Sequence, residues 1–280
     1  MTSVHTPESL DAALAALAEP GALAVAGCTD LMVPGSPHQG AARPVVDLSR
    51  VPELSGISVS DGFVDIGAGE TFAKVRHDPA VQRHLPALAQ VAATVGALQI
   101  QARATIGGNI ANASPAGDSL PVLLALDAEV LLAGPAGERT LAYEDMHTGY
   151  RQTALALGEL IVRVRLPLPA DGALQRFTKV GTRQAQAISK VSVAFAARRD
   201  GEVLRQVRFA AGSVAATPVR LPSAEAVCEG VVLNADLAEV AGRAAAGDVT
   251  PMDDVRSTAA YRRFVLARCV RRIVLDAAQG

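Results

Sequence analysis

One short segment, Pro167-Leu168-Pro169-Ala170-Asp171-Gly172, limits what this chain can fold into more than any other. Its prolines lack a backbone N–H and its Asp-Gly pair favours a turn, so no regular helix or sheet ladder continues through it. The segment divides a chain of 280 residues, which exceeds the usual size of a single domain. We therefore predict two domains, residues 1–170 and residues 173–280.

Helical and strand patterns alternate before this linker. Apolar residues at helical spacing predict helices at residues 10–17, 80–95 and 120–126. Short apolar or alternating runs predict strands at residues 23–26, 45–48, 57–59, 64–66, 129–133 and 160–166. Asp61-Gly62 separates two of these strands and is a strong hairpin signal.

The pattern changes after the linker. Strands are expected at residues 174–179, 191–199 and 202–211, and Asp200-Gly201 would turn the second hairpin. Helices follow near Ser223, Leu237 and Ser257. Arg262 and the arginines after it predict a solvated basic face on the last helix. This order of elements predicts an α+β protein.

Residues 105–118 crowd glycines and small polar residues into a segment typical of a ligand-binding loop. Gly107 and Gly108 allow positive φ and close approach to the backbone. Asn109, Asn112 and Ser114 add hydrogen-bonding side chains, and the segment could bind an anion beside a helix N-terminus. A plain turn before a helix capped by Asp118 or Ser119 is the alternative.

A second segment, residues 24–31, reads as a buried strand that runs into a Gly-Cys-Thr turn. Such a strand-to-turn junction can also cradle an anion, although the pattern is common. Together, residues 26–31 and 104–118 closely resemble the FAD-binding medium subunit of molybdenum hydroxylases, the family of xanthine dehydrogenase and carbon monoxide dehydrogenase. Further stretches support the resemblance: residues 149–151, 159–167, 177–183 and 257–262.

This resemblance implies an N-terminal FAD-binding domain of the PCMH type with two subdomains, followed by a C-terminal antiparallel sheet with packed helices. It also implies that FAD binds to Ala24, Val25, Ala26, Gly27, Cys28, Thr29, Asp30, Leu31, Thr105, Gly107, Gly108, Asn109, Asn112, Ser114, Asp118, Ile161 and Lys179. Tyr150 would lie near the flavin ring. The chain departs from the family at Cys28, where glycine is common, and at residues 184–191, a region that may govern the electron acceptor in the family.

The resemblance further implies a subunit of a larger complex. A separate large subunit would hold the molybdenum cofactor, a separate small subunit would hold [2Fe-2S] clusters, and electrons would leave FAD to NAD or another acceptor. Three scattered cysteines in this chain cannot supply four thiolates to a cluster. Two other functions stay open: a self-sufficient FAD-dependent oxidoreductase with the same flavin domain, and a non-redox nucleotide-binding assembly module.

Composition excludes other classes. A net charge of −2 gives no sign of a nucleic-acid binder. Long apolar runs and a signal-like N-terminus are missing from the sequence, so we expect a cytoplasmic protein without a membrane span. The five histidines are scattered and predict no metal site.

Overall fold

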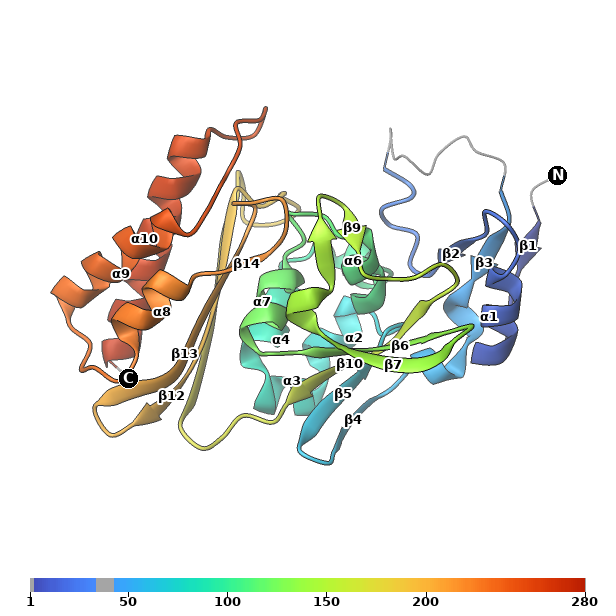
Figure 1. Cartoon of the computed structure of the whole chain (residues 1–280), viewed down its shortest axis with the longest axis horizontal. Coiled ribbons are helices and arrows are strands. Elements are labelled where there is room, and N and C mark those ends of the chain that lie inside the picture. The colour runs from blue at the N-terminus through green and yellow to red at the C-terminus, as the bar shows by residue number, and fades with distance from the viewer. Residues whose placement is uncertain (1–2, 34–42, 280) are drawn as a thin grey trace.

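The computed structural model describes residues 3–33 and 43–279, and its first elements form a small parallel sheet. Strands β1 (Val4–His5), β2 (Leu23–Val25) and β3 (Val45–Asp47) pair in the order β1-β3-β2. Helix α1 (Leu10–Leu17) begins at Ser9, whose side chain accepts a hydrogen bond from the N–H of Ala12. This sheet lies at one end of the molecule (Figure 1).

A five-stranded antiparallel sheet forms the second unit of the N-terminal part. Its order is β4-β5-β10-β6-β7, with β4 (Ile57–Ser60), β5 (Phe63–Gly67), β6 (Glu129–Gly134), β7 (Gly137–Ala142) and β10 (Leu160–Pro167). Asp61 and Gly62 both have positive φ between β4 and β5, as a two-residue hairpin turn requires. The hairpin prediction is therefore confirmed. Strand β7 is not among the strands that the sequence patterns predicted.

Short helices lie between β5 and β6: α2 (Phe72–His77), α3 (Pro79–His84), α4 (Pro86–Ala92), α5 (Leu98–Gln101), α6 (Ile106–Asn112) and α7 (Ser119–Ala125). The prediction of one helix over residues 80–95 is wrong. Asp78 caps α3 with Pro79 at its first position, and Pro86 begins α4 after a break at Leu85. A proline has no N–H to continue the preceding helix, so the chain starts a new one.

After the 3₁₀ turn Tyr143–Asp145, strands β8 (His147–Gly149) and β9 (Gln152–Thr153) form a separate small hairpin. Residues 168–172 then run without helix or strand to β11. The C-terminal sheet is antiparallel in the order β11-β12-β13-β14, with β11 (Ala173–Val180), β12 (Val191–Asp200), β13 (Val203–Gly212) and β14 (Val219–Arg220). Helices α8 (Pro222–Cys228), α9 (Ala235–Gly247) and α10 (Ala259–Gln279) follow.

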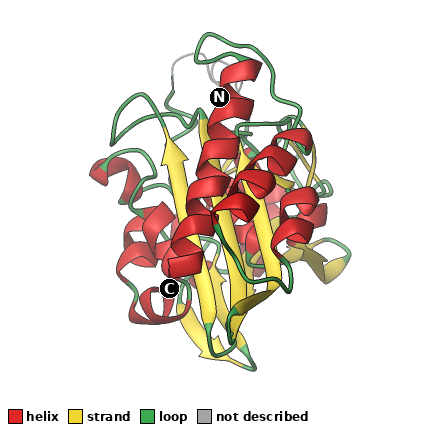
Figure 2. Ribbon diagram, turned by 90° about the vertical axis from the view of Figure 1, so that its left-hand side faces the viewer, coloured by secondary structure: helices red, strands yellow, loops and turns green. Residues whose placement is uncertain are grey.

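The C-terminal sheet is buried on both faces. On one face, large side chains such as Phe195 and Phe209 pack with the apolar sides of α8, α9 and α10. Figure 2 shows these helices in front of the sheet. On the other face, the alanines Ala194, Ala196 and Ala210 belong to the core that contains α4 and α7. Small side chains on this face let the N-terminal helices pack directly against the strands.

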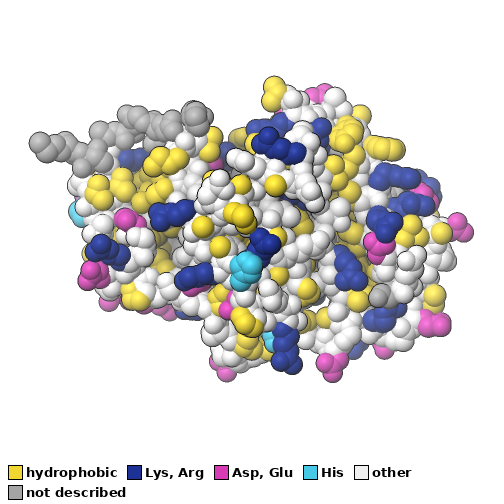
Figure 3. Space-filling view, turned by 180° about the vertical axis from the view of Figure 1, so that it is seen from behind, with side chains coloured by type: hydrophobic (Ala, Val, Ile, Leu, Met, Phe, Trp, Pro, Cys, Tyr) yellow, Lys and Arg dark blue, Asp and Glu magenta, His cyan; other side chains and the backbone are white. Residues whose placement is uncertain are grey.

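The architecture confirms the predicted α+β fold class, with a sheet-and-helix N-terminal part and a C-terminal antiparallel sheet covered by helices. Charge is distributed over the surface rather than concentrated. Figure 3 shows basic and acidic side chains interspersed over one face of the molecule.

Candidate functional site

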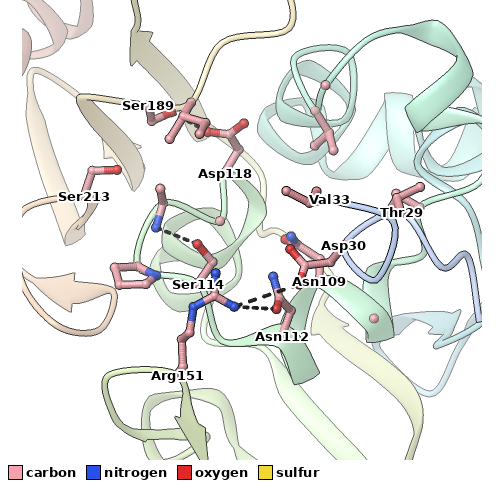
Figure 4. A pocket seen from close by; sticks show the side chains of 18 of the residues that line it. Thr29, Asp30, Val33, Asn109, Asn112, Ser114, Asp118, Arg151, Ser189 and Ser213 are labelled. Carbon is pink, nitrogen blue, oxygen red and sulfur yellow. Dashed lines mark hydrogen bonds and ion pairs between the residues drawn. The ribbon is translucent and has the colours of Figure 1, made fainter. Parts of the chain in front are cut away.

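A cavity of about 750 Å³ lies between the N-terminal part and the loops of the C-terminal sheet. Its volume falls within the roughly 300–1,000 Å³ of typical small-molecule sites. The wall from the N-terminal part consists of the turn after β2, parts of residues 104–118 and the tip of the β8–β9 hairpin (Figure 4). The opposite wall consists of residues 186–189, 213–216 and 250–256 and of Arg262.

The turn after β2 lines this cavity with Gly27, Cys28 and Thr29. Among the described residues, no acceptor is bonded to the N–H groups of Gly27, Cys28 or Thr29. Cys28 has a φ of 59°, in the left-handed region, and a turn of this kind directs successive N–H groups to one point. The turn therefore combines a left-handed residue with N–H groups that have no acceptor among the described residues, two features of an anion-binding nest.

Gly27 holds this turn against the second predicted segment. A Cβ at Gly27 would collide with the backbone carbonyl of Arg103, directly before Ala104 and Thr105. Only glycine permits this close approach. The structure thus brings together the two segments that the sequence singled out.

The glycine segment itself differs from the expected loop, because residues 106–112 form helix α6. Thr105 caps it and accepts a hydrogen bond of 3.1 Å from the N–H of Gly108. The carbonyls of Glu70 and Ala68 accept from the N–H groups of Ile106 and Gly107. The first N–H groups of α6 are thereby occupied within the chain.

The two glycines of α6 have different roles, and neither has positive φ. A Cβ at Gly107 would lie 2.6 Å from the Cβ of Ala68, so this glycine allows α6 to pack on the residue after β5. Gly108 lines the cavity, and a Cβ there would meet only the Thr105 hydroxyl, at 2.9 Å. The absent side chain of Gly108 leaves space in the cavity.

Polar side chains around α6 are positioned by their neighbours. Asn109 accepts a hydrogen bond of 2.7 Å from the hydroxyl of Ser119 and so joins α6 to α7. The Ser114 hydroxyl accepts from the N–H of Ala116 at 3.3 Å. Such contacts fix the side chains before any ligand arrives.

Asp118 directly precedes α7 but makes no side-chain capping bond, so the capping alternative is wrong. Its carboxylate instead accepts hydrogen bonds of 2.5 Å from the Lys179 ammonium and from the Ser189 hydroxyl. Burial raises the pKa of the Asp118 carboxyl, and Lys179 and Ser189 oppose that shift. Lys179 also donates to the carbonyl of Thr94 at 3.0 Å. This buried group connects β11 to the N-terminal helices.

Fourteen of the seventeen predicted residues line the cavity, and the three that do not are Gly107, Ile161 and Lys179. Ile161 lies in the core on β10, and Lys179 lies behind Asp118. Tyr150 also lines the cavity, with 59% of its surface exposed.

The sequence did not predict the C-terminal wall. Arg262 was expected on a solvated face, but only 4% of it is exposed. Its guanidinium donates to the carbonyls of Lys190 and Ser213 at 2.8 and 2.7 Å, and to the Asp254 carboxylate at 2.9 Å. Arg262 therefore holds three loops together. A tyrosine-arginine pair at the start of a helix gives no signal of this role.

Two negative observations concern the described residues alone. In the ranges 3–33 and 43–279, no group of His, Cys, Asp or Glu is placed to hold a metal ion. Within the same ranges, every helix is too short or too polar to cross a membrane.

Comparison with known proteins identifies the family. Residues 1–169 match the model of the FAD binding domain in molybdopterin dehydrogenase, and residues 176–277 match that of the CO dehydrogenase flavoprotein C-terminal domain. The chain belongs to the FAD-binding medium subunits of molybdenum hydroxylases of the xanthine dehydrogenase and CO dehydrogenase type. The resemblance noted in the sequence is confirmed.

Individual relatives agree with this assignment. The putative xanthine dehydrogenase FAD-binding subunit of Escherichia coli is 32% identical, over 98% of this chain and 95% of its own length. The structure of carbon monoxide dehydrogenase from Hydrogenophaga pseudoflava aligns with a TM-score of 0.94 and 30% identity, covering 99% of this chain and 97% of the other. The structure of quinoline 2-oxidoreductase from Pseudomonas putida aligns with a TM-score of 0.93 and 29% identity, covering 100% of this chain and 98% of the other.

Cys28 places a side chain at a backbone position in the left-handed region, with a φ of 59°. Its thiol donates to the carbonyl of Ala26 at 3.5 Å. Burial raises the pKa of the thiol, Asp47 adds to this shift and Arg103 opposes it. The thiol is therefore protonated at neutral pH, and Cys28 acts in this medium subunit as a small side chain on a strained backbone.

We predict that Cys28→Gly raises the free energy of unfolding by about 0.5–1 kcal/mol, because glycine adopts the left-handed conformation without steric cost. Urea unfolding of the flavin-free protein measures this difference. Cys28→Ala is the control, since it removes the thiol and keeps the backbone strain. A glycine variant no more stable than the alanine variant would contradict the assignment of strain.

A pair of side chains, the buried Tyr143 and the partly buried His147, supports the β8–β9 hairpin that reaches the cavity. The Tyr143 hydroxyl and the His147 Nε2 share a hydrogen bond of 3.0 Å. Burial lowers the pKa of His147 to about 4, and the buried Nδ1 has no partner within the described residues. His147 is therefore neutral in the folded protein at pH values where the unfolded chain already carries the charge.

Because the pKa of His147 is about 6.5 in the unfolded chain and about 4 in the folded protein, the free energy of unfolding falls as the pH drops below about 6.5. This decrease levels off near pH 4. We predict a loss of up to about 3 kcal/mol over this range from His147. His147→Gln should remove that part of the pH dependence in urea unfolding, with His84→Gln as the control. An unchanged pH dependence in His147→Gln would rule this origin out.

Proposed function

We propose that this medium subunit carries electrons from [2Fe-2S] clusters of a small partner subunit, through FAD in the described cavity, to NAD or another acceptor. A large partner subunit would hold the molybdenum cofactor. The observation that carries the proposal is the turn at Gly27, Cys28 and Thr29, whose N–H groups have no acceptor among the described residues, on the wall of a cavity of about 750 Å³. It lies in the part of the chain matched by an FAD-binding family model.

The residues present fit FAD. The N–H groups of the turn after β2 suit pyrophosphate oxygens, since a nest favours an anion. Thr29, Asn109, Asn112 and Ser114 line the cavity with groups suited to hydroxyl and phosphate oxygens. We extend the proposal of FAD binding to all seventeen residues that the family resemblance implied in the sequence analysis. Lys179 and Ile161 do not line the cavity and would act on FAD from behind its wall. The Lys179 ammonium, which lies next to Asp118, would stabilise negative charge there.

When bound, FAD supplies the ability to take up single electrons and to release a pair or a hydride. The protein orients the cofactor and sets the charge around it. Each described carboxylate of the cavity wall lies in an ion pair with a cation. The pairs are Asp30 with Arg151, Asp118 with Lys179, and Asp254 with Arg262. Each of these carboxylates would have to leave its cationic partner before it could take up a proton from a substrate. This charge pairing favours an electron-transfer subunit over a self-sufficient oxidoreductase with its own acid or base.

Location and domain limits belong to the same proposal. The two family models meet between residues 169 and 176, which supports domains of residues 1–170 and 173–280. Cys28, Cys228 and Cys269 are free thiols, which agrees with a reducing compartment such as the cytoplasm.

We predict that Gly108→Val weakens FAD binding about tenfold or more, because a branched side chain would enter the cavity at α6. Titration of the flavin-free protein with FAD, followed by fluorescence, measures the affinity. Gly247→Val is the matched control, since a Cβ at the end of α9 meets nothing within 4 Å. Unfolding of both flavin-free variants separates lost binding from lost structure. Equal FAD affinity in the two folded variants would contradict the proposal that FAD binds in this cavity.

A second prediction concerns the complex. The isolated chain should bind FAD, bleach on reduction, and contain no iron or molybdenum, because its cysteines cannot form a four-thiolate site. Iron, molybdenum and substrate-dependent hydroxylation should appear when the two partner subunits are produced with it. Metal analysis and turnover assays on both preparations check this. Stoichiometric metal or full turnover in the isolated chain would contradict the subunit role, and a colourless, nucleotide-responsive chain would favour the assembly module.

A further inference from the structure

Arg151 connects the two segments that form the N-terminal wall of the cavity. Its Nη1 donates a hydrogen bond of 3.0 Å to the Asn112 side-chain oxygen, at the end of α6. The same nitrogen lies 3.9 Å from an oxygen of Asp30, in the turn after β2. Figure 4 shows the Arg151 guanidinium directed toward both side chains, with both contacts drawn. Arg151 thus bridges the α6 side of the cavity and the turn that carries the N–H nest.

The arginine sits on a support that is fixed at its base and exposed at its tip. The Tyr143–His147 pair and a hydrogen bond of 2.9 Å from the N–H of Ala154 to the carbonyl of Met146 hold the base of the β8–β9 hairpin. At the tip, Arg151 has a φ of 52°, a conformation that costs a non-glycine residue free energy. The hairpin therefore keeps a strained backbone whose side chain reaches across the cavity wall.

Charge gives Arg151 a distinct place among the cavity residues. Of the arginines that line the described cavity, Arg256 and Arg262 lie on the C-terminal wall, where both pair with Asp254. Arg151 is the one cation lining the N-terminal wall within the described residues. It neutralises Asp30, which would otherwise bring a negative charge next to the N–H nest.

The contacts of Arg151 are able to open. Its side chain and that of Asp30 are 37% and 40% exposed. Pairs of this exposure are weak and exchange with water. A buried pair such as Asp118–Lys179 has no such freedom.

We propose that Arg151 is a positioning residue, a clasp that joins the turn after β2 to the end of α6 across the mouth of the cavity and slows the release of FAD. The inference rests on the proposed function. A closed clasp keeps the two segments around the ligand, and an open clasp lets them separate. Changes at one binding site as a rule alter the release rate more than the association rate, so loss of the bridge should mainly speed release.

The test compares the release of FAD from the full-length wild-type protein and from Arg151→Gln. Glutamine removes the charge and keeps a polar side chain of similar reach. At low salt the variant should release FAD about fivefold faster, the combined effect of one exposed ion pair and one hydrogen bond. Association should change by less than about twofold. Flavin fluorescence after strong dilution follows release, and stopped-flow mixing follows association.

Salt separates a clasp from a general structural role. An exposed ion pair is screened at about 1 M salt, where the Debye length falls to about 3 Å. The ratio of the two release rates should therefore fall toward one at high salt. Damage to packing would give a ratio that salt does not reduce. Arg50→Gln is the matched control, since it breaks an exposed contact of 3.8 Å with Glu8 outside the cavity and should leave release unchanged.

A conservative variant keeps the test decisive if the glutamine protein folds poorly. Arg151→Lys retains the charge but lacks the planar fork that serves two acceptors, so its release rate should lie between those of wild type and Arg151→Gln. Equal release by wild type and folded Arg151→Gln at low salt, or a rate ratio independent of salt, would overturn the clasp. A wild-type chain that binds no FAD would instead overturn the proposed function.

Discussion

The buried ion pair between Asp118 and Lys179 is the contact on which the cavity depends. Asp118 belongs to the N-terminal part and Lys179 to the first strand of the C-terminal sheet. With Ser189 and the carbonyl of Thr94, they satisfy one another at a site where the Lys179 and Asp118 side chains are only 10% and 9% exposed. A buried pair adds little net stability, because desolvation offsets attraction, but removal of one partner is costly. The pair therefore fixes how the two parts meet.

Arg262 has the matching role on the opposite wall. It gathers the start of β12, the end of β13 and the loop at Asp254. The two centres act in different ways. Asp118–Lys179 sets the relation between the two parts, whereas Arg262 sets the shape of the loops that only one part contributes. Rigid groups around a redox cofactor suit a protein whose task is orientation and electrostatic tuning.

The sequence predicted features that depend on local chemistry. The hairpin around Asp61-Gly62 and the linker at residues 167–172 rest on turn preferences that no distant residue alters. Helix α6 escaped prediction because Gly107 and Gly108 lower helix propensity, while carbonyls of Ala68 and Glu70 and the Thr105 cap stabilise it. The lining residues of the N-terminal wall were predicted by family resemblance. The C-terminal wall was not, since tertiary folding alone brings Ser213, Asp254 and Arg262 together.

The alanine face of the C-terminal sheet limits how the molecule can move. Ala194, Ala196 and Ala210 place the strands directly against the core that contains α4 and α7, and Arg208 adds a hydrogen bond to the carbonyl of Ala125 in α7. Interfaces of small side chains in close contact resist shear, because any displacement opens voids or creates overlap. The two parts of the chain should therefore behave as one rigid body. A cofactor would then enter and leave by local movement of the loops and hairpin around the cavity, while the width of the cavity itself stays constant.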